Sequence, residues 1–345
     1  MSKRIVLFNH KGGVNKTTSV YNLGWMLSKS KRVLVVDADP QCNLSSLMLG
    51  DNFEKYYIDD DTKKQNIKDG VKVAFEGKPA PITDIVCTSS TRAPNLFLLA
   101  GHANLSEYES SLSFALTSSS SIATLQNLPG AFSELLRLTE EKYKVDYTLI
   151  DLNPSLSAIN QILFIISNGF VVPTNPDPFS IMALNTLRNI LPKWYEWKTS
   201  MIPYFEDAAY PLPGGTPYFL GTIIQRFNIR KGKAAKPYKN NIDEIKHITK
   251  NELFQSLKDS LMVLSPENYE QANIKQKNGF CFQEISDFQS LLPRSYETGV
   301  PVFDLTDKEL NATGPILKQL QEKRDLFKKL FSDFANQIIE ISKHV

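Results

Sequence analysis

Short apolar runs alternate along the chain with segments whose apolar residues recur at helical spacing. The runs have about the length of strands and are typical of strands buried in a sheet. They cover residues 4–8, 32–36, 96–99, 147–150, 169–173 and 218–227. Because strands and helices alternate, we expect one α/β domain in which a doubly wound, mostly parallel twisted sheet is flanked by helices on both faces.

Helical patterns and one polar segment complete the single domain predicted for residues 1–345. Helices are expected at 157–168, at 181–193 and, as the last element, at about 315–341. Residues 51–80 are polar and charged, so we expect a solvated excursion over the sheet there.

The predicted last helix carries an apolar stripe that has two interpretations. Its large residues are Phe327, Phe331, Phe334, Ile338 and Ile341. Such a stripe either packs in the core or lies on a membrane surface. Packing in the core is much the commoner use, and only Lys328 and Lys329 lie nearby as lipid contacts, so we favour the core.

Composition narrows the class of protein. The chain has 345 residues, 42% of them hydrophobic, and a net charge of +2, which gives no global reason to expect nucleic acid. Three scattered cysteines argue against a disulfide framework or a zinc site. No apolar run approaches the 18 residues of a membrane span. We therefore expect a cytoplasmic protein, and any basic site must be local.

The segment Asn9–Thr18, with the sequence NHKGGVNKTT, carries the strongest chemical signal. It connects a predicted strand to a predicted helix and contains two glycines. In such a loop, successive backbone N–H groups surround a phosphate at the helix N-terminus. Lys16 can reach the outer phosphates, and the Thr17 hydroxyl can bind magnesium. His10 and Asn15 stand where the strict phosphate-loop pattern has glycine.

Three predicted strands end in groups that could serve one site. They are followed by the loop 11–18, by Asp37 with Asp39, and by Asp151. Ligands of open parallel sheets bind outside the carboxyl ends of the strands. Together these strand ends predict a site for a nucleoside triphosphate and magnesium.

Three segments resemble the ParA/MinD family of P-loop ATPases. Lys11–Thr18 resembles its deviant Walker A motif, Asp37–Asn43 its DxDPQxN segment, and Asp151–Ser155 its D-x-x-P-S segment. The resemblance implies ATP and Mg²⁺ as cofactors. It implies catalytic roles for Lys11, Lys16 and Asp39, magnesium binding by Thr17, Asp37 and Asp151, and nucleotide contacts by Gly12, Gly13, Val14, Asn15, Lys16, Thr17, Thr18, Gln225 and Pro293.

The resemblance also implies partners. In the family, a lysine at the place of Lys11 reaches the nucleotide of a second protomer, which implies a homodimer on ATP. A ParB-like or cargo-adaptor protein would stimulate hydrolysis. Asn15 departs from the family glycine; Asn adopts positive φ at low cost, so we expect the loop to form and hydrolysis to be slow.

A basic run without acidic residues lies between 226 and 242. Its cations are Arg226, Arg230, Lys231, Lys233, Lys236 and Lys239. Two interpretations stay open: a solvated face, or a mobile loop that contacts DNA phosphates without regard to sequence. The resemblance to ParA-type proteins favours DNA.

Several functions remain in view. The first is a ParA-like ATPase that positions or partitions a cargo on non-specific DNA. The second is a nucleotide-dependent switch or scaffold with weak hydrolysis in a larger secretion or defence assembly. The third is a MinD-like membrane-positioning ATPase. A Rossmann oxidoreductase would need the G-x-G-x-x-G motif, which the chain lacks.

Overall fold

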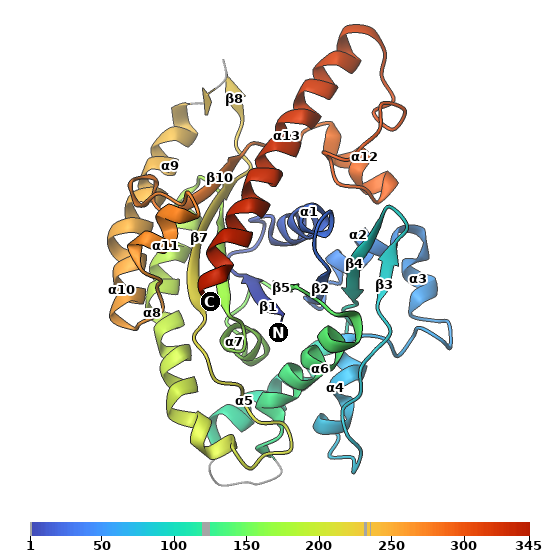
Figure 1. Ribbon diagram of the computed structural model, residues 1–345, viewed down its shortest axis with the longest axis vertical. Helices are drawn as coiled ribbons and strands as arrows, with labels where there is room; N and C mark the ends of the chain where they lie inside the picture. Colours follow the sequence, from blue (N-terminus) through green and yellow to red (C-terminus); the bar gives the residue numbers. More distant parts are fainter. Residues whose placement is uncertain (1, 119–124, 231–232, 235) are drawn as a thin grey trace.

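The computed structural model describes residues 2–118, 125–230, 233–234 and 236–345. At its centre is an eight-stranded sheet with the order β10-β7-β6-β1-β5-β2-β4-β3 (Figure 1). Its strands are β1 (Lys3–Leu7), β2 (Val33–Ala38), β3 (Thr88–Ser90), β4 (Ala93–Leu99), β5 (Tyr147–Leu152), β6 (Gly169–Thr174), β7 (Tyr218–Gln225) and β10 (Cys281–Ile285). Within this sheet only β3 runs antiparallel to its neighbour, so the predicted doubly wound, mostly parallel sheet is confirmed.

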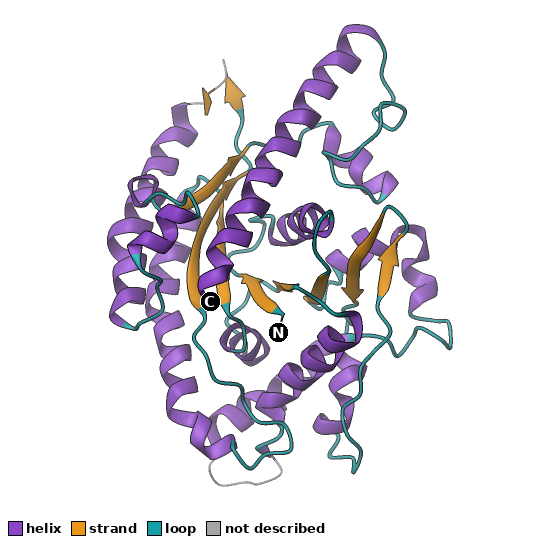
Figure 2. Ribbon diagram, viewed as in Figure 1, coloured by secondary structure: helices purple, strands orange, loops and turns teal. Residues whose placement is uncertain are grey.

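Helices cover both faces of the sheet (Figure 2). On one face lie α1 (Lys16–Ser28) and α13 (Gly314–Ile341), and on the other lie α6 (Leu128–Tyr143), α7 (Ala158–Ile165) and α8 (Pro178–Met201). The strands between them are buried on both sides, which explains their continuous apolar runs. The other helices are α2 (Asn43–Leu49), α3 (Phe53–Tyr56), α4 (Ile67–Phe75), α5 (Glu109–Ser118), α9 (Lys236–Ile248), α10 (Phe254–Asp259), α11 (Pro266–Gln271) and α12 (Leu291–Thr298).

The apolar stripe of α13 belongs to the core. Phe327, Phe331, Phe334, Ile338 and Ile341 are all buried. The ring of Phe334 lies 5.0 Å from that of Phe282 on β10, measured between centroids. The interpretation as a core stripe is therefore confirmed, and the stripe is not available to a membrane. Of the helices that the structure describes, none is both long and apolar enough to cross a bilayer.

Some elements differ from the sequence predictions. The segment 51–80 is more structured than a solvated excursion, because it contains α3 and α4, and α4 buries Ile67 and Val71 beside α6. The edge strands β3 and β10 were not predicted. The basic run is not simply a loop: it includes the strands β8 (Ile229–Arg230) and β9 (Lys233–Ala234) and the start of α9.

Candidate functional site

The loop between β1 and α1 has the backbone conformation of a phosphate cradle. Gly13 has φ 72°, and Asn15, which directly precedes α1, has φ 55° and ψ 33°. Asn15 therefore occupies the left-handed region, which glycine enters freely and asparagine at lower cost than most residues. The loop geometry needs positive φ at this position, and Asn15 provides it while adding a side chain.

The side chain of Lys16 lies inside the loop and contacts its backbone. Its side chain is buried, and its Nζ donates to the carbonyl oxygens of Asn9 at 2.9 Å and Lys11 at 3.2 Å. Burial lowers the pKa of Lys16, and the carboxylates of Asp151 and Asp39 act in the opposite direction. An amine held among carbonyls and near two acids is suited to an anionic ligand that can complete its surroundings.

Asp151 and Asp37 are register partners on neighbouring strands, yet their carboxylates differ in surroundings. Both oxygens of Asp151 are buried without a hydrogen-bond partner. Asp37 accepts through Oδ2 from the backbone N–H of Ser45 at 2.8 Å and from the Ser45 hydroxyl at 2.7 Å. Burial raises the pKa of Asp37 to about 6 and raises that of Asp151 as well. Asp37 thus fixes the start of α2, while Asp151 still needs a cation or a donor.

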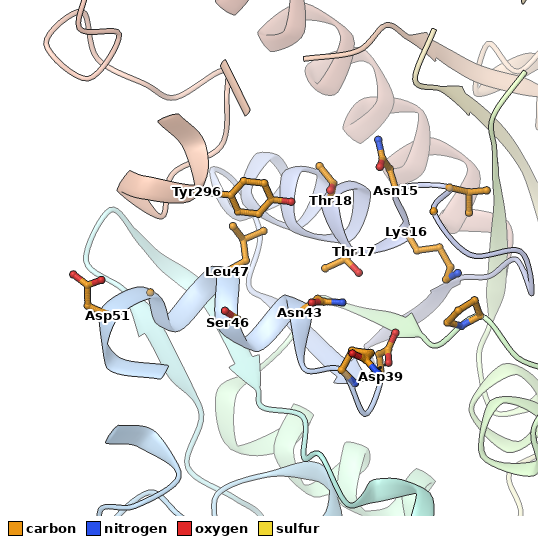
Figure 3. A pocket seen from close by; sticks show the side chains of 15 residues that line it. Asn15, Lys16, Thr17, Thr18, Asp39, Asn43, Ser46, Leu47, Asp51 and Tyr296 are labelled. Atoms are coloured by element: carbon orange, nitrogen blue, oxygen red, sulfur yellow. Dashed lines mark hydrogen bonds between the residues drawn. The ribbon is translucent and has the colours of Figure 1, made fainter. Parts of the chain in front are cut away.

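A cavity of about 660 Å³ opens over this loop (Figure 3), within the usual range for small-molecule sites. Its lining consists of Gly13, Val14, Asn15, Lys16, Thr17, Thr18, Asp39, Gln41, Asn43, Ser46, Leu47, Gly50, Asp51, Pro154 and Tyr296. Most of these residues were predicted from the loop or belong to the segments 37–43 and 151–155. Tyr296, on α12, was not.

The oxygen donors beside the cavity fit magnesium better than a softer metal. Thr17 supplies a hydroxyl, and Asp151 supplies an unpartnered carboxylate. Among the described residues, no three acidic, histidine or cysteine side chains form a metal site by themselves. An ion here would therefore depend on oxygens of a bound phosphate and of water for much of its coordination.

Gln225 makes two hydrogen bonds beside the phosphate loop. Its side chain is buried behind the loop, accepts from the Ser19 hydroxyl at 2.8 Å and donates to the Val14 carbonyl at 3.1 Å. The amide therefore holds the loop, and a contact of Gln225 with a nucleotide stays a prediction. Pro293 is exposed on α12 and is absent from the cavity lining, which the same helix reaches one turn later with Tyr296.

Lys11 is held within its own protomer. Its Nζ lies 2.6 Å from Oδ2 of Asp177, the residue that caps the N-terminus of α8 through the backbone N–H of Ser180. The side chains of Lys11 and Asp177 are 19% and 33% exposed. The ion pair thus connects the phosphate loop to α8 at the protein surface.

The basic run is only partly covered by the structure. Arg226 lies against the phosphate loop, where its guanidinium donates to the Gly13 carbonyl at 3.1 Å, and Lys239 is exposed on α9. Lys231 lies outside the described residues, as do the side chains of Arg230, Lys233 and Lys236. The structure therefore places Arg226 at the candidate site and Lys239 on the surface of α9.

Comparison with known proteins agrees with this geometry. A family model described as "AAA domain" matches residues 2–202, more than half of the chain. An uncharacterized protein of Mycobacterium tuberculosis is 31% identical over 193 residues, which cover 56% of this chain and 52% of that protein. The sporulation initiation inhibitor protein Soj of Bacillus subtilis is 29% identical over 190 residues, 55% of this chain and 64% of Soj. The chain thus spans about half to two thirds of the length of these relatives.

A solved structure extends the likeness to the whole fold. The ParA protein of pNOB8, described as bound to nonspecific DNA, aligns with 99% of this chain and 99% of its own, with a TM-score of 0.54 and 18% identity. At that identity the likeness concerns the fold alone.

Proposed function

Since this chain belongs to the ParA/MinD-type P-loop ATPases, we propose that it binds Mg-ATP, dimerises on it and hydrolyses it to position or partition a cargo on non-specific DNA. The observation that carries the proposal is the carboxylate of Asp151, which is buried without a partner beside the strand that leads into the phosphate loop. A hard divalent cation and its water would satisfy that carboxylate. The Soj relative and the DNA-bound ParA structure support the class of protein.

Residues in and beside the cavity would share the chemistry. Backbone N–H groups of 12–18 and the amine of Lys16 bind the phosphates. Thr17, Asp37 and Asp151 would hold magnesium, and Asp37 would contribute by positioning the ion. A bound magnesium ion would neutralise charge on the phosphate oxygens. Asp39, whose Oδ1 accepts from the backbone N–H of Gln41 at 2.9 Å, orients the attacking water.

Dimerisation is assigned to Lys11, which would leave Asp177 and reach the nucleotide of a second protomer. Lys11→Ala should therefore bind ATP yet stay monomeric in gel filtration with a non-hydrolysable analogue. Asp39→Ala should retain ATP and accumulate as a dimer, because hydrolysis no longer releases the protomers. A ParB-like or cargo-adaptor protein would accelerate that release, in the cytoplasm and at the nucleoid.

Lys246→Ala is the matched control for Lys11→Ala. The Lys246 side chain is also 19% exposed and ion-paired, with Glu284 at 2.5 Å. The Lys246→Ala variant should dimerise as the wild type does. A normal dimer in Lys11→Ala would remove Lys11 from the interface, whereas loss of the dimer in both variants would indicate a general effect of losing a surface charge.

DNA binding is assigned to the run 226–239. If about three cations per protomer touch phosphates, a dimer engages about six, and the slope of log K against log salt lies near −5. Arg230→Glu with Lys233→Glu should weaken binding equally for unrelated sequences, since phosphate contacts carry no base information. Lys63→Glu with Lys64→Glu is the control reversal. DNA binding that is insensitive to salt, to ATP or to the substitutions Arg230→Glu and Lys233→Glu would contradict a function on DNA.

A second function, a nucleotide-dependent switch or scaffold with weak hydrolysis, is favoured by the side chain that Asn15 adds to the cavity lining. If that side chain crowds the transferred phosphate, Asn15→Gly should raise turnover. One lost transition-state contact costs about 2–4 kcal/mol, so the gain should lie between about 30-fold and about 1000-fold. Steady-state phosphate release measures it. An unchanged or lower rate would mean that Asn15 is an adapted part of an active enzyme.

A further inference from the structure

Three successive backbone carbonyls of the phosphate loop accept hydrogen bonds from outside the cavity. The Asn15 carbonyl accepts from the backbone N–H of Ser19, in the first turn of α1, at 2.9 Å. The Val14 carbonyl accepts from the side-chain amide of Gln225. The Gly13 carbonyl accepts from two side chains at once. None of these donor residues belongs to the cavity lining, so the three carbonyls point away from the cavity.

The two donors to the Gly13 carbonyl follow different strands. Asn175 comes directly after β6 and donates through its side-chain amide at 2.9 Å. Arg226 comes directly after β7 and donates through Nη1 at 3.1 Å. Because β1, β6 and β7 are neighbours in the parallel part of the sheet, the residues after their carboxyl ends meet at one edge. Two strands thus contribute one donor each to the loop that follows β1.

The backbones of both donor residues are themselves fixed. The backbone N–H of Asn175 donates to the hydroxyl of the buried Ser180 at 3.1 Å. The backbone N–H of Arg226 donates to the carbonyl of Ile285, on β10, at 3.1 Å. Arg226 also has φ 58°, a conformation that costs free energy for any residue except glycine. An arginine kept in this conformation points to a role that depends on where its side chain lies.

The direction of the Gly13 carbonyl decides where the next N–H group points. In a trans peptide the C=O and N–H bonds point in opposite directions. With the Gly13 carbonyl turned toward its two donors, the Val14 N–H faces the other side, where both residues line the cavity. Gly13, at φ 72°, has no side chain to restrict its backbone. A reversed peptide would present a carbonyl oxygen to a bound phosphate, which would repel it.

We propose that Asn175 and Arg226 are positioning residues for nucleotide binding, which hold the Gly13 carbonyl outward so that the Val14 N–H stays directed at the phosphates. The proposal rests on the nucleotide site described under the proposed function. It gives Arg226, the first cation of the basic run, a role at the phosphate loop itself. A carbonyl oxygen has two lone pairs, and either donor can hold it alone. Losing both donors should therefore cost more than the two single losses together.

Calorimetry on the full chain with magnesium and ATP tests the two donors. Asn175→Ala and Arg226→Met should each weaken ATP binding about threefold, because the remaining donor still holds the carbonyl. The double variant should lose more than the product of these effects, which is about tenfold, because only then is the peptide free to turn. Inorganic triphosphate should lose affinity by the same factors, since the effect acts on the phosphates and not on the base.

A rescue variant and a matched control separate positioning from general damage. Arg226→Lys combined with Asn175→Ala keeps a charged donor at the loop and should bind ATP as Asn175→Ala alone does. Asn189→Ala removes another side-chain amide that donates to a backbone carbonyl, that of Asn185 at 3.1 Å. Asn189 is exposed on α8 and lies outside the cavity lining, so its loss should leave ATP affinity unchanged.

Several results would contradict the positioning role. A double variant that binds ATP as the wild type does, or whose loss equals the product of the single losses, would overturn it. A loss for ATP without a loss for triphosphate would overturn it as well, and so would a failure of Arg226→Lys to restore binding. A wild type that binds neither ATP nor triphosphate would instead overturn the proposed function, on which the positioning role depends.

Discussion

Two lysines are buried at opposite edges of the same sheet, and their surroundings differ. Lys16 lies at the carboxyl edge, in the phosphate loop. Lys198, on α8, lies at the amino edge, between the end of α7 and the segment that leads into β7. Their exposed fractions are 7% and 1%, and burial lowers the pKa of both.

The hydrogen-bond partners of Lys16 and Lys198 distinguish the two sites. Lys198 donates to the carbonyls of Ile165, Gly214 and Gly215 at 2.6, 3.1 and 2.7 Å, which uses all three of its N–H groups. Lys16 donates to two carbonyls and lies near Asp151, whose oxygens lack partners. A buried cation is therefore not by itself a sign of function. Unsatisfied groups around the cation are the sign, because their desolvation cost is recovered only when a ligand binds.

The largest expected effect comes from removing the amines of Lys16 and Lys198 in turn. Lys16→Ala should reduce ATP affinity at least about 100-fold, or about 3 kcal/mol, because the phosphates lose a charge-assisted contact in a buried site. Lys198→Met should leave ATP affinity unchanged. Calorimetry measures both, and equal ATP affinity in wild type and Lys16→Ala would overturn the site assignment.

A smaller effect concerns stability. Lys198→Met should lower the free energy of unfolding by about 2 kcal/mol, since the buried Ile165 carbonyl loses its donor while the apolar stem is kept. Urea denaturation without nucleotide measures this difference. If Lys198→Met is as stable as the wild type, the three carbonyls do not depend on the amine, and Lys198 has no structural role.

The smallest effect is a pH dependence that belongs to Lys198. Burial lowers its pKa to about 8, whereas the unfolded chain keeps this lysine protonated up to its ordinary value of 10.5. The folded state therefore binds fewer protons between these values, and the free energy of unfolding rises with pH. Around pH 8 the slope is about 0.7 kcal/mol per pH unit. The wild type should show this rise relative to Lys198→Met, and parallel pH profiles would contradict it.

The sequence predicts the carboxyl edge well because its groups are local to strand ends. The loop 11–18, Asp39 and Asp151 each follow an apolar strand directly, so a parallel sheet is enough to bring them together. The structure places Lys16, Thr17 and Asp39 at the cavity, and their roles stay predictions. The strand β10 was not predicted because Gln283 and Glu284 interrupt its apolar pattern at the sheet edge.

Contacts between distant segments could not be predicted in this way. Tyr296 lines the cavity from α12, and the end of this helix is held by a hydrogen bond from Tyr21 to Gly299, 278 residues apart in the chain. Gln225 ends its strand as a base-reading residue might, but Ser19 and Val14 lie close enough to take both ends of its amide. Lys198 gives no signal in the sequence, since its acceptors are backbone carbonyls supplied by three separate positions.

The ion pair between Lys11 and Asp177 determines how readily the lysine is released. Ion pairs near the protein surface contribute about 1 kcal/mol or less, so little free energy is needed to open this one. The proposed contact of Lys11 with a second protomer requires that this pair open first. Because Asp177 also caps α8, release of Lys11 leaves the carboxylate at the start of that helix without its counter-charge, so the position of Lys11 changes the electrostatics of the N-terminus of α8.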